Sequence, residues 1–136
     1  MADWVLALDI GGTKLAAGLV RVDGTVACQD SAPTNGRRTA EGLYADLLTL
    51  CERVLAAGNV AEAELVGVGV GCGGPMLYPE GLVSPLNIPA WRHGFPLRHS
   101  LQERFGRPAL VDNDAKALAL GEHWIGAGQG AGCLLG

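Results

Sequence analysis

A short stretch near the amino terminus combines an aspartate, two glycines, a hydroxyl group and a cation. Asp9 stands at the carboxyl end of an apolar run, where a buried strand would give way to a turn. Gly11 and Gly12 allow the backbone to turn sharply, so their N–H groups are expected to point at phosphate oxygens. Thr13 adds a hydroxyl donor and Lys14 a positive charge. Asp9 is suited to hold Mg²⁺ through water, because magnesium keeps much of its hydration shell.

This glycine turn has a second interpretation, as a plain hairpin turn with a surface aspartate and lysine. The Walker pattern G-x-x-x-x-G-K-[ST] does not occur in the sequence. The dinucleotide pattern G-x-G-x-x-G does occur at residues 69–74, but three prolines follow it between residues 75 and 85. These prolines disfavour the helix whose N-terminus would face a pyrophosphate. A nicotinamide cofactor is therefore not expected.

A second polar cluster follows a later apolar run and consists of Asp112, Asn113 and Asp114. Ligands in α/β sheets bind at the carboxyl ends of strands. Asp114 falls in the first turn of a predicted helix, whose dipole favours an ionised carboxylate. Such a carboxylate can accept the proton of a hydroxyl group that attacks phosphorus, and Asn113 can bind a neighbouring sugar hydroxyl. Helix capping and local turn chemistry are the competing explanation.

Hydrophobic patterning predicts the elements that position these groups. Apolar runs predict strands at residues 4–10, 15–22, 25–30, 65–70 and 108–111. Asp23-Gly24 is a two-residue hairpin signal, and residues 31–38 are expected to form a loop. Helical spacing and cap residues predict helices that follow Thr39, that span residues 97–105, and that run from 112 or 113 to about 125. Residues 71–96 are expected to be irregular but packed, and residues 131–135 to begin another strand.

The element order β-β-β-α-β-α-β-α places the chain in the α/β class. Three antiparallel strands followed by βα units form a mixed sheet with helices on its faces. This arrangement is typical of the ribonuclease H-like domain, which is also the actin-like ATPase domain. A length of 136 residues corresponds to about one such domain.

Composition excludes several functional classes. The net charge is −4 and no basic run occurs, which argues against nucleic acid as a partner. The four cysteines are scattered and form no C-x-x-C, so neither a zinc site nor a disulfide framework is expected. No signal peptide and no apolar run of about 20 residues is present, so no membrane segment is expected. These features favour a cytoplasmic protein.

Four segments, in order along the chain, resemble motifs of the ROK family (repressors, open reading frames, kinases). Residues 8–14 resemble its first phosphate motif, and residues 67–75 resemble its glycine-rich sugar loop. The double glycine of that loop is closer to the N-acylmannosamine kinase variant than to the commoner P-G-P form. Residues 84–91 resemble the N-[LI]-P-x-W segment, and residues 111–122 resemble the catalytic N-D-A-x-A-x-A-x-x-E segment.

The resemblance implies a role for each matching residue. It makes Asp114 the catalytic base. The substrate-binding residues would be Gly73, Gly74, Asn87, Asn113 and Asp114. The residues serving ATP would be Asp9, Gly11, Gly12, Thr13 and Lys14, with Asp9 also serving the metal. Lys116 replaces the family's commoner asparagine and is expected to face solvent.

The resemblance also implies an activity, the ATP- and Mg²⁺-dependent phosphorylation of a hexose or N-acylhexosamine. Residues 1–136 would then form the N-terminal domain of a two-domain sugar kinase. The family's second phosphate loop, E-x-G-H motif and cysteine-rich zinc site do not occur in this sequence, so the chain alone is expected to be inactive. Sugar and ATP are the expected partners, and a homodimer is compatible with the family.

Two other functions fit parts of the same pattern. A ROK sugar-responsive repressor would carry a helix-turn-helix before the first phosphate motif, and the three residues before Trp4 leave no room for one. A ribonuclease H-like nuclease could gather two Mg²⁺ ions on Asp9, Asp112 and Asp114. The Gly-Gly-Thr-Lys turn is unnecessary for that chemistry, and the acidic balance disfavours DNA.

Overall fold

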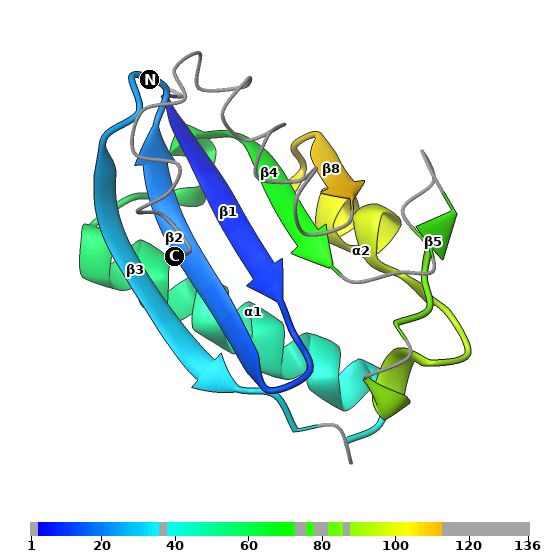
Figure 1. The fold of residues 1–136 in the computed structure, drawn as a ribbon. Coiled ribbons are helices and arrows are strands. Elements are labelled where there is room, and N and C mark those ends of the chain that lie inside the picture. Colours follow the sequence, from blue (N-terminus) through cyan, green and yellow to red (C-terminus); the bar gives the residue numbers. More distant parts are fainter. Residues whose placement is uncertain (1–2, 36–37, 73–75, 78–81, 86–87, 113–136) are drawn as a thin grey trace.

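The computed structural model describes residues 3–35, 38–72, 76–77, 82–85 and 88–112. Its main sheet has five strands in the order β3-β2-β1-β4-β8 (Figure 1). These strands are β1 (Trp4–Ile10), β2 (Lys14–Arg21), β3 (Val26–Pro33), β4 (Leu65–Cys72) and β8 (Ala109–Asp112). β1, β2 and β3 pair antiparallel, whereas β4 pairs parallel with both β1 and β8. The predicted mixed sheet is therefore confirmed.

The connection between β2 and β3 differs from the predicted two-residue hairpin. Four residues separate the strands, from Val22 to Thr25. The Gly24 N–H donates to the Arg21 carbonyl at 2.8 Å, and Gly24 has a φ of 97°, which favours glycine. β3 also continues to Pro33, beyond the predicted end at residue 30, because Lys14 of β2 pairs with Pro33. Residues 31–33 are therefore part of the sheet rather than of a loop.

Two helices, α1 (Ala40–Gly58) and α2 (Leu97–Phe105), pack against one face of the main sheet (Figure 1). The Thr39 hydroxyl accepts a hydrogen bond from the Gly42 N–H at 2.9 Å, as the cap prediction required. Asn59 ends α1 in the left-handed conformation with a φ of 55°. The predicted inward face of α1 is fully buried and consists of Leu43, Leu47, Leu50 and Val54.

Alternation along β1 divides its side chains between the two faces of the sheet. Leu6, Leu8 and Ile10 belong to the large core beneath the helices. Val5 and Ala7 belong to a second, smaller cluster with Val20 and Val26. Asp9 follows the second set by alternation, and its side chain is half-buried.

The segment between β4 and α2 contains structure that hydrophobic patterning does not predict. A small antiparallel sheet has the order β5-β6-β7, from β5 (Met76–Leu77), β6 (Leu82–Val83) and β7 (Phe95–Pro96). This segment also contains a short 3₁₀ helix, η2 (Pro89–Trp91), before β7. A second 3₁₀ helix, η1 (Glu62–Glu64), lies outside the segment, directly before β4. Val83, Ile88 and Trp91 are at most 1% exposed, so the prediction of a packed segment is confirmed.

Two predicted elements, the helix ending near residue 125 and the strand at residues 131–135, lie outside the described residues. Within the described ranges, no helix is long and apolar enough to cross a membrane.

Candidate phosphate and sugar site

The strand register brings the two predicted chemical segments to one edge of the sheet. Asp9 of β1 pairs with Gly71 of β4, and Gly71 pairs with Asp112 of β8. These three strands are parallel, so their carboxyl ends lie at the same edge (Figure 1). The phosphate turn after β1 and the end of β8 at Asp112 therefore lie at the same level of the sheet.

The turn from Gly11 to Lys14 is tight. The Gly11 N–H donates to the Lys14 carbonyl at 2.9 Å, and a Cβ added at Gly11 would lie 3.2 Å from that same oxygen. The prediction that both glycine N–H groups point at phosphate is therefore wrong for Gly11, because its N–H closes the turn. Within the described part of the chain, no acceptor is found for the N–H of Gly12.

Exposure follows the order of residues along this turn. Asp9, Gly11 and Gly12 are partly buried, whereas Thr13 and Lys14 are exposed. An anion approaching the turn from solvent could thus reach the Gly12 N–H and the Lys14 ammonium group, and backbone N–H groups of this kind commonly bind phosphate.

Thr34, immediately after β3, makes two hydrogen bonds to the turn that the sequence does not predict. Its hydroxyl group donates to the Gly11 carbonyl at 2.7 Å, and its N–H donates to the Thr13 carbonyl at 3.0 Å. Thr34 is partly buried. No local pattern distinguishes it, because Gly11 lies 23 residues earlier in the chain and the contact depends on the β2–β3 register.

The predicted sugar-binding residues and the predicted base lie outside the described residues. They are Gly73, Gly74, Asn87, Asn113 and Asp114. Two described residues beside them are buried in the fold. Cys72, directly before Gly73, is fully buried and pairs with Ile10 at the end of β1. Ile88, directly after Asn87, is 1% exposed.

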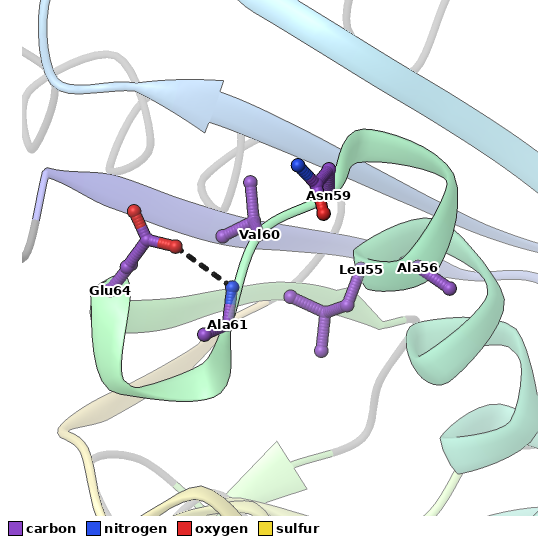
Figure 2. A pocket seen from close by; sticks show the side chains of 6 residues that line it. All are labelled: Leu55, Ala56, Asn59, Val60, Ala61 and Glu64. Atoms are coloured by element: carbon purple, nitrogen blue, oxygen red, sulfur yellow. Dashed lines mark hydrogen bonds between the residues drawn. The ribbon is translucent and has the colours of Figure 1, made fainter.

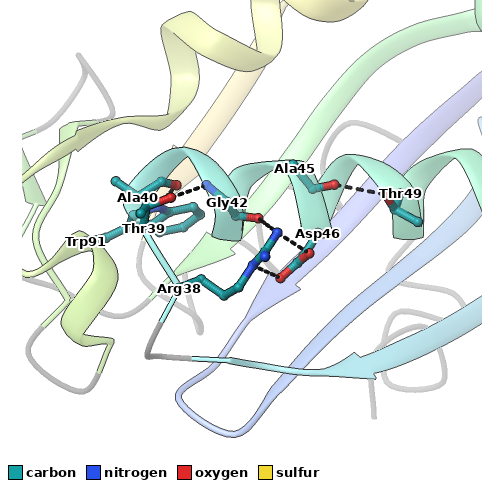
Figure 3. A network of polar contacts seen from close by, with 8 residues as sticks. All are labelled: Arg38, Thr39, Ala40, Gly42, Ala45, Asp46, Thr49 and Trp91. Atoms are coloured by element: carbon teal, nitrogen blue, oxygen red, sulfur yellow. Dashed lines mark hydrogen bonds and ion pairs between the residues drawn. The ribbon is translucent and has the colours of Figure 1, made fainter.

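The segment after Asn87 is attached firmly to the first turn of α1. The indole N–H of Trp91 donates to the Ala40 carbonyl at 3.0 Å (Figure 3). The Trp91 ring stacks on Phe95 with centroids 4.7 Å apart, and Tyr44 lies 5.3 Å from Phe95. Burial raises the pKa of Tyr44 to about 12, so its hydroxyl group stays neutral at physiological pH.

The same turn of α1 carries a surface ion pair next to the Thr39 cap (Figure 3). Arg38 donates to both carboxylate oxygens of Asp46 at 3.2 Å, and also to the Gly42 carbonyl at 3.2 Å. These groups are exposed and bind one another, so they hold the helix start rather than offering a site.

A hollow of about 370 Å³ lies at the other end of α1, away from the phosphate turn (Figure 2). Its lining is Leu55, Ala56, Asn59, Val60, Ala61 and Glu64. Glu64 is the ionisable residue in this lining, and its carboxylate accepts a hydrogen bond from the Ala61 N–H at 2.9 Å. The hollow therefore lacks chemical groups that would act on a substrate.

Nearly the whole chain matches one protein family. The model of the ROK family matches residues 5–135, which is nearly the whole sequence. The chain belongs to the ROK family.

Named relatives of this ROK chain are sugar kinases. A glucokinase of Halalkalibacterium halodurans is 32% identical over 129 residues, covering 94% of the chain and 38% of the relative. An N-acetylmannosamine kinase of Escherichia fergusonii is 33% identical over 118 residues, covering 87% of the chain and 38% of the relative. The chain thus spans about two fifths of the length of these relatives.

Solved ROK structures share the fold. A ROK hexokinase from Thermus thermophilus superposes with a TM-score of 0.73 at 35% identity, over 88% of this chain and 38% of that one. A ROK glucokinase from Streptomyces griseus, in complex with glucose and AMPPNP, gives 0.72 at 33% identity, over 93% and 38%. A ROK transcriptional regulator, at 21% identity and a TM-score of 0.70, shares the fold alone. The predicted ribonuclease H-like, actin-like ATPase fold is confirmed.

Proposed function

We propose that this ROK chain is the N-terminal, phosphate- and sugar-binding domain of an ATP-dependent sugar kinase. The kinase transfers the γ-phosphoryl group of ATP to a hydroxyl group of a hexose or N-acylhexosamine. Family membership and the names of its relatives support the reaction class. A sugar and ATP are its partners, and a homodimer fits the family. The free thiols of Cys28 and Cys51 fit a reducing cytoplasm.

The observation that carries the proposal is the register that aligns Asp9, Gly71 and Asp112. Neighbouring strands lie about 4.8 Å apart, so about 10 Å separates the backbones of Asp9 and Asp112. Two residues of chain span at most about 7 Å, so we expect Asp114 near the same edge. A nucleotide phosphate at the turn and a sugar hydroxyl at Asp114 would then be within reach of each other.

The chain's residues divide the work between binding and proton transfer. The Gly12 N–H and the ammonium group of Lys14 bind phosphate oxygens, and the Thr13 hydroxyl group assists them. On the sugar side, Asn113 holds a hydroxyl group next to the reacting one, and the carboxylate of Asp114 accepts the proton of the reacting hydroxyl. Gly73, Gly74 and Asn87 line the rest of the sugar pocket. Positioning of the two substrates accounts for most of the rate.

The described residues fit Mg²⁺ bound together with the nucleotide rather than in a protein cage. Among them, no group of three or more His, Cys, Asp or Glu side chains could hold a metal ion. Magnesium is usually bound by one or two carboxylates plus phosphate oxygens and water, which the half-buried Asp9 beside the turn can provide. When bound, the ion would neutralise charge on the phosphates.

The direct test is an ADP-release assay on the full-length gene product with glucose, mannose and N-acetylmannosamine. We expect turnover of at least one sugar, and no measurable turnover by residues 1–136 alone. Asp114→Asn in the full-length gene product is the matched control. It should fold, because asparagine caps a helix as well as aspartate does, but it should lose most of the turnover. Absence of turnover with all three sugars, or robust turnover by residues 1–136 alone, would contradict the proposal.

A further inference from the structure

The phosphate turn is shaped by a residue that lies outside it. Two of its carbonyl groups, those of Gly11 and Thr13, accept hydrogen bonds from Thr34 at 2.7 and 3.0 Å. The ladder between β2 and β3 ends where Lys14 pairs with Pro33, so both contacts add to the strand pairing. Thr34 thus joins the end of β3 to the turn that follows β1.

The direction of the Gly12 N–H follows from the contact to Gly11. A trans peptide group is planar, and its C=O and N–H point in opposite directions. The Gly11 carbonyl points toward the Thr34 hydroxyl, so the Gly12 N–H in the same peptide plane points away from Thr34. Among the described residues, no acceptor meets this N–H.

We propose that Thr34 is a positioning residue for phosphate binding, which acts by fixing the peptide plane that aims the Gly12 N–H at a nucleotide phosphate. This inference rests on the proposed kinase function and deepens it. A fixed donor binds an anion better than a mobile one, because its orientation is already set before binding. The inference predicts that loss of the Thr34 hydroxyl group weakens nucleotide binding and leaves sugar binding unchanged.

The kinetic test compares two substitutions at one position in the full-length gene product. Thr34→Val keeps the shape of the side chain and the backbone N–H but removes the hydroxyl group, whereas Thr34→Ser keeps the hydroxyl group. We expect Thr34→Val to raise KM for ATP about tenfold, the factor that one lost hydrogen bond supplies. KM for the sugar should stay unchanged, and Thr34→Ser should stay within about twofold of the wild type for both substrates.

Thr49→Val is the matched control. The Thr49 hydroxyl group also donates to a backbone carbonyl, that of Ala45 at 3.0 Å, but on the exposed side of α1 (Figure 3). The Thr49→Val substitution should leave both KM values unchanged. If Thr34→Val is not folded by circular dichroism, Thr34→Ala takes its place. A Thr34→Val or Thr34→Ala variant with a wild-type KM for ATP, or with equal changes in both KM values, overturns the inference.

A binding measurement separates this inference from the proposed function. NMR can follow the Gly12 amide of the full-length gene product during titration with sodium triphosphate, without any turnover. We expect a shift in the wild type and in Thr34→Ser, and about tenfold weaker binding in Thr34→Val. A Gly12 amide that does not respond in the wild type overturns the inference even if the kinase is active. A response that depends on Thr34 supports it even if no sugar is phosphorylated.

Discussion

The two ends of the main sheet are held in different ways. At the carboxyl end of β1, the Gly11–Lys14 turn is fixed by its own hydrogen bond and by Thr34, and its tip is exposed. At the amino ends of β4 and β8, two arginines bind several groups each. Arg104 donates to both carboxylate oxygens of Glu62, at 2.8 and 2.9 Å.

The second arginine of the amino end completes this network. Arg107 donates to the carbonyl group of Leu65, the first residue of β4, at 2.7 Å, and to that of Ala63 in η1 at 3.2 Å. Arg104 reaches further to Glu52 of α1 at 3.4 Å. Helix, 3₁₀ helix and strand are thus tied together where no ligand is expected, which leaves the other end free to carry polar groups toward solvent.

These different contacts at the two ends predict that binding and stability are separable in this domain. Binding sites on a rigid scaffold keep donors for the ligand, whereas most of the scaffold's own buried polar groups are paired. Substitutions at the carboxyl end should therefore change kinetics with little change in stability. Substitutions at the amino end should do the opposite.

The largest expected effect is at the carboxyl end. In the full-length gene product, Asp114→Asn should lower kcat by about 10²-fold or more, the scale of a positioned general base. The thermal midpoint should change little, because asparagine is also a good cap. Steady-state kinetics and calorimetry on one sample check both parts. A near-normal kcat would show that Asp114 is not the base. A variant that does not fold would contradict the proposed separation of binding from stability.

Trp91 is part of the buried core but also lies in the segment that follows Asn87, a predicted sugar-binding residue. It should therefore affect both stability and binding. Trp91→Phe removes the hydrogen bond to Ala40 and leaves a space beside Phe95. We expect a loss of about 2–3 kcal/mol in the free energy of unfolding, measured by urea denaturation. KM for the sugar should rise more than KM for ATP. Equal effects on both would mean that Trp91 serves only the core.

Most of the large elements could be predicted from the sequence, because each has a strong local pattern. The bounds of β1 and α2 match the predicted residues 4–10 and 97–105. The two-residue strands β5, β6 and β7 could not be predicted, since so short a segment has no periodicity. The extension of β3 to Pro33 depends on pairing with Lys14, a contact between distant residues.

The site was predicted less completely than the fold, for a related reason. Residue types and spacing identified Asp9 and the glycine turn, but the use of each N–H depends on geometry. Gly11 uses its N–H to close the turn, and Thr34 enters through a register that no local pattern encodes. The roles of Asn113 and Asp114 remain predictions from the family resemblance.

The arginine network gives a smaller effect, at the amino end. Arg104→Gln should lower the free energy of unfolding by about 1 kcal/mol, because it breaks a bidentate pair that is partly shielded from water. Both KM values should be unchanged. Arg38→Gln is the matched control, since Arg38 also pairs with a carboxylate, Asp46, but on the exposed start of α1. If the control destabilises as much as Arg104→Gln, the amino end has no special part in stability.

The smallest expected effect is a pH dependence at the same end of the sheet. Hydrogen bonds from Arg104 hold the pKa of Glu62 below its ordinary value of 4.5. A carboxylate with a lowered pKa in the folded state stabilises the fold above its unfolded pKa, and this stabilisation is lost as pH falls through the folded value. The free energy of unfolding should therefore fall between about pH 5 and pH 3 less steeply in Glu62→Gln than in the wild type.

At neutral pH, the free energies of unfolding of the wild type and Glu62→Gln should differ by less than about 1 kcal/mol. The Glu62 side chain is 42% exposed, so water screens its ion pair with Arg104. This difference should shrink as pH falls, because Glu62 becomes protonated in both states once pH is below its folded pKa. Urea denaturation at several pH values measures the slope. In an Arg104→Gln background, Glu62→Gln should cause no further change in slope, since the cause of the lowered pKa is already gone. A pH slope that Glu62→Gln leaves unaltered would assign the stabilising role at this end to Arg107 and its backbone contacts instead.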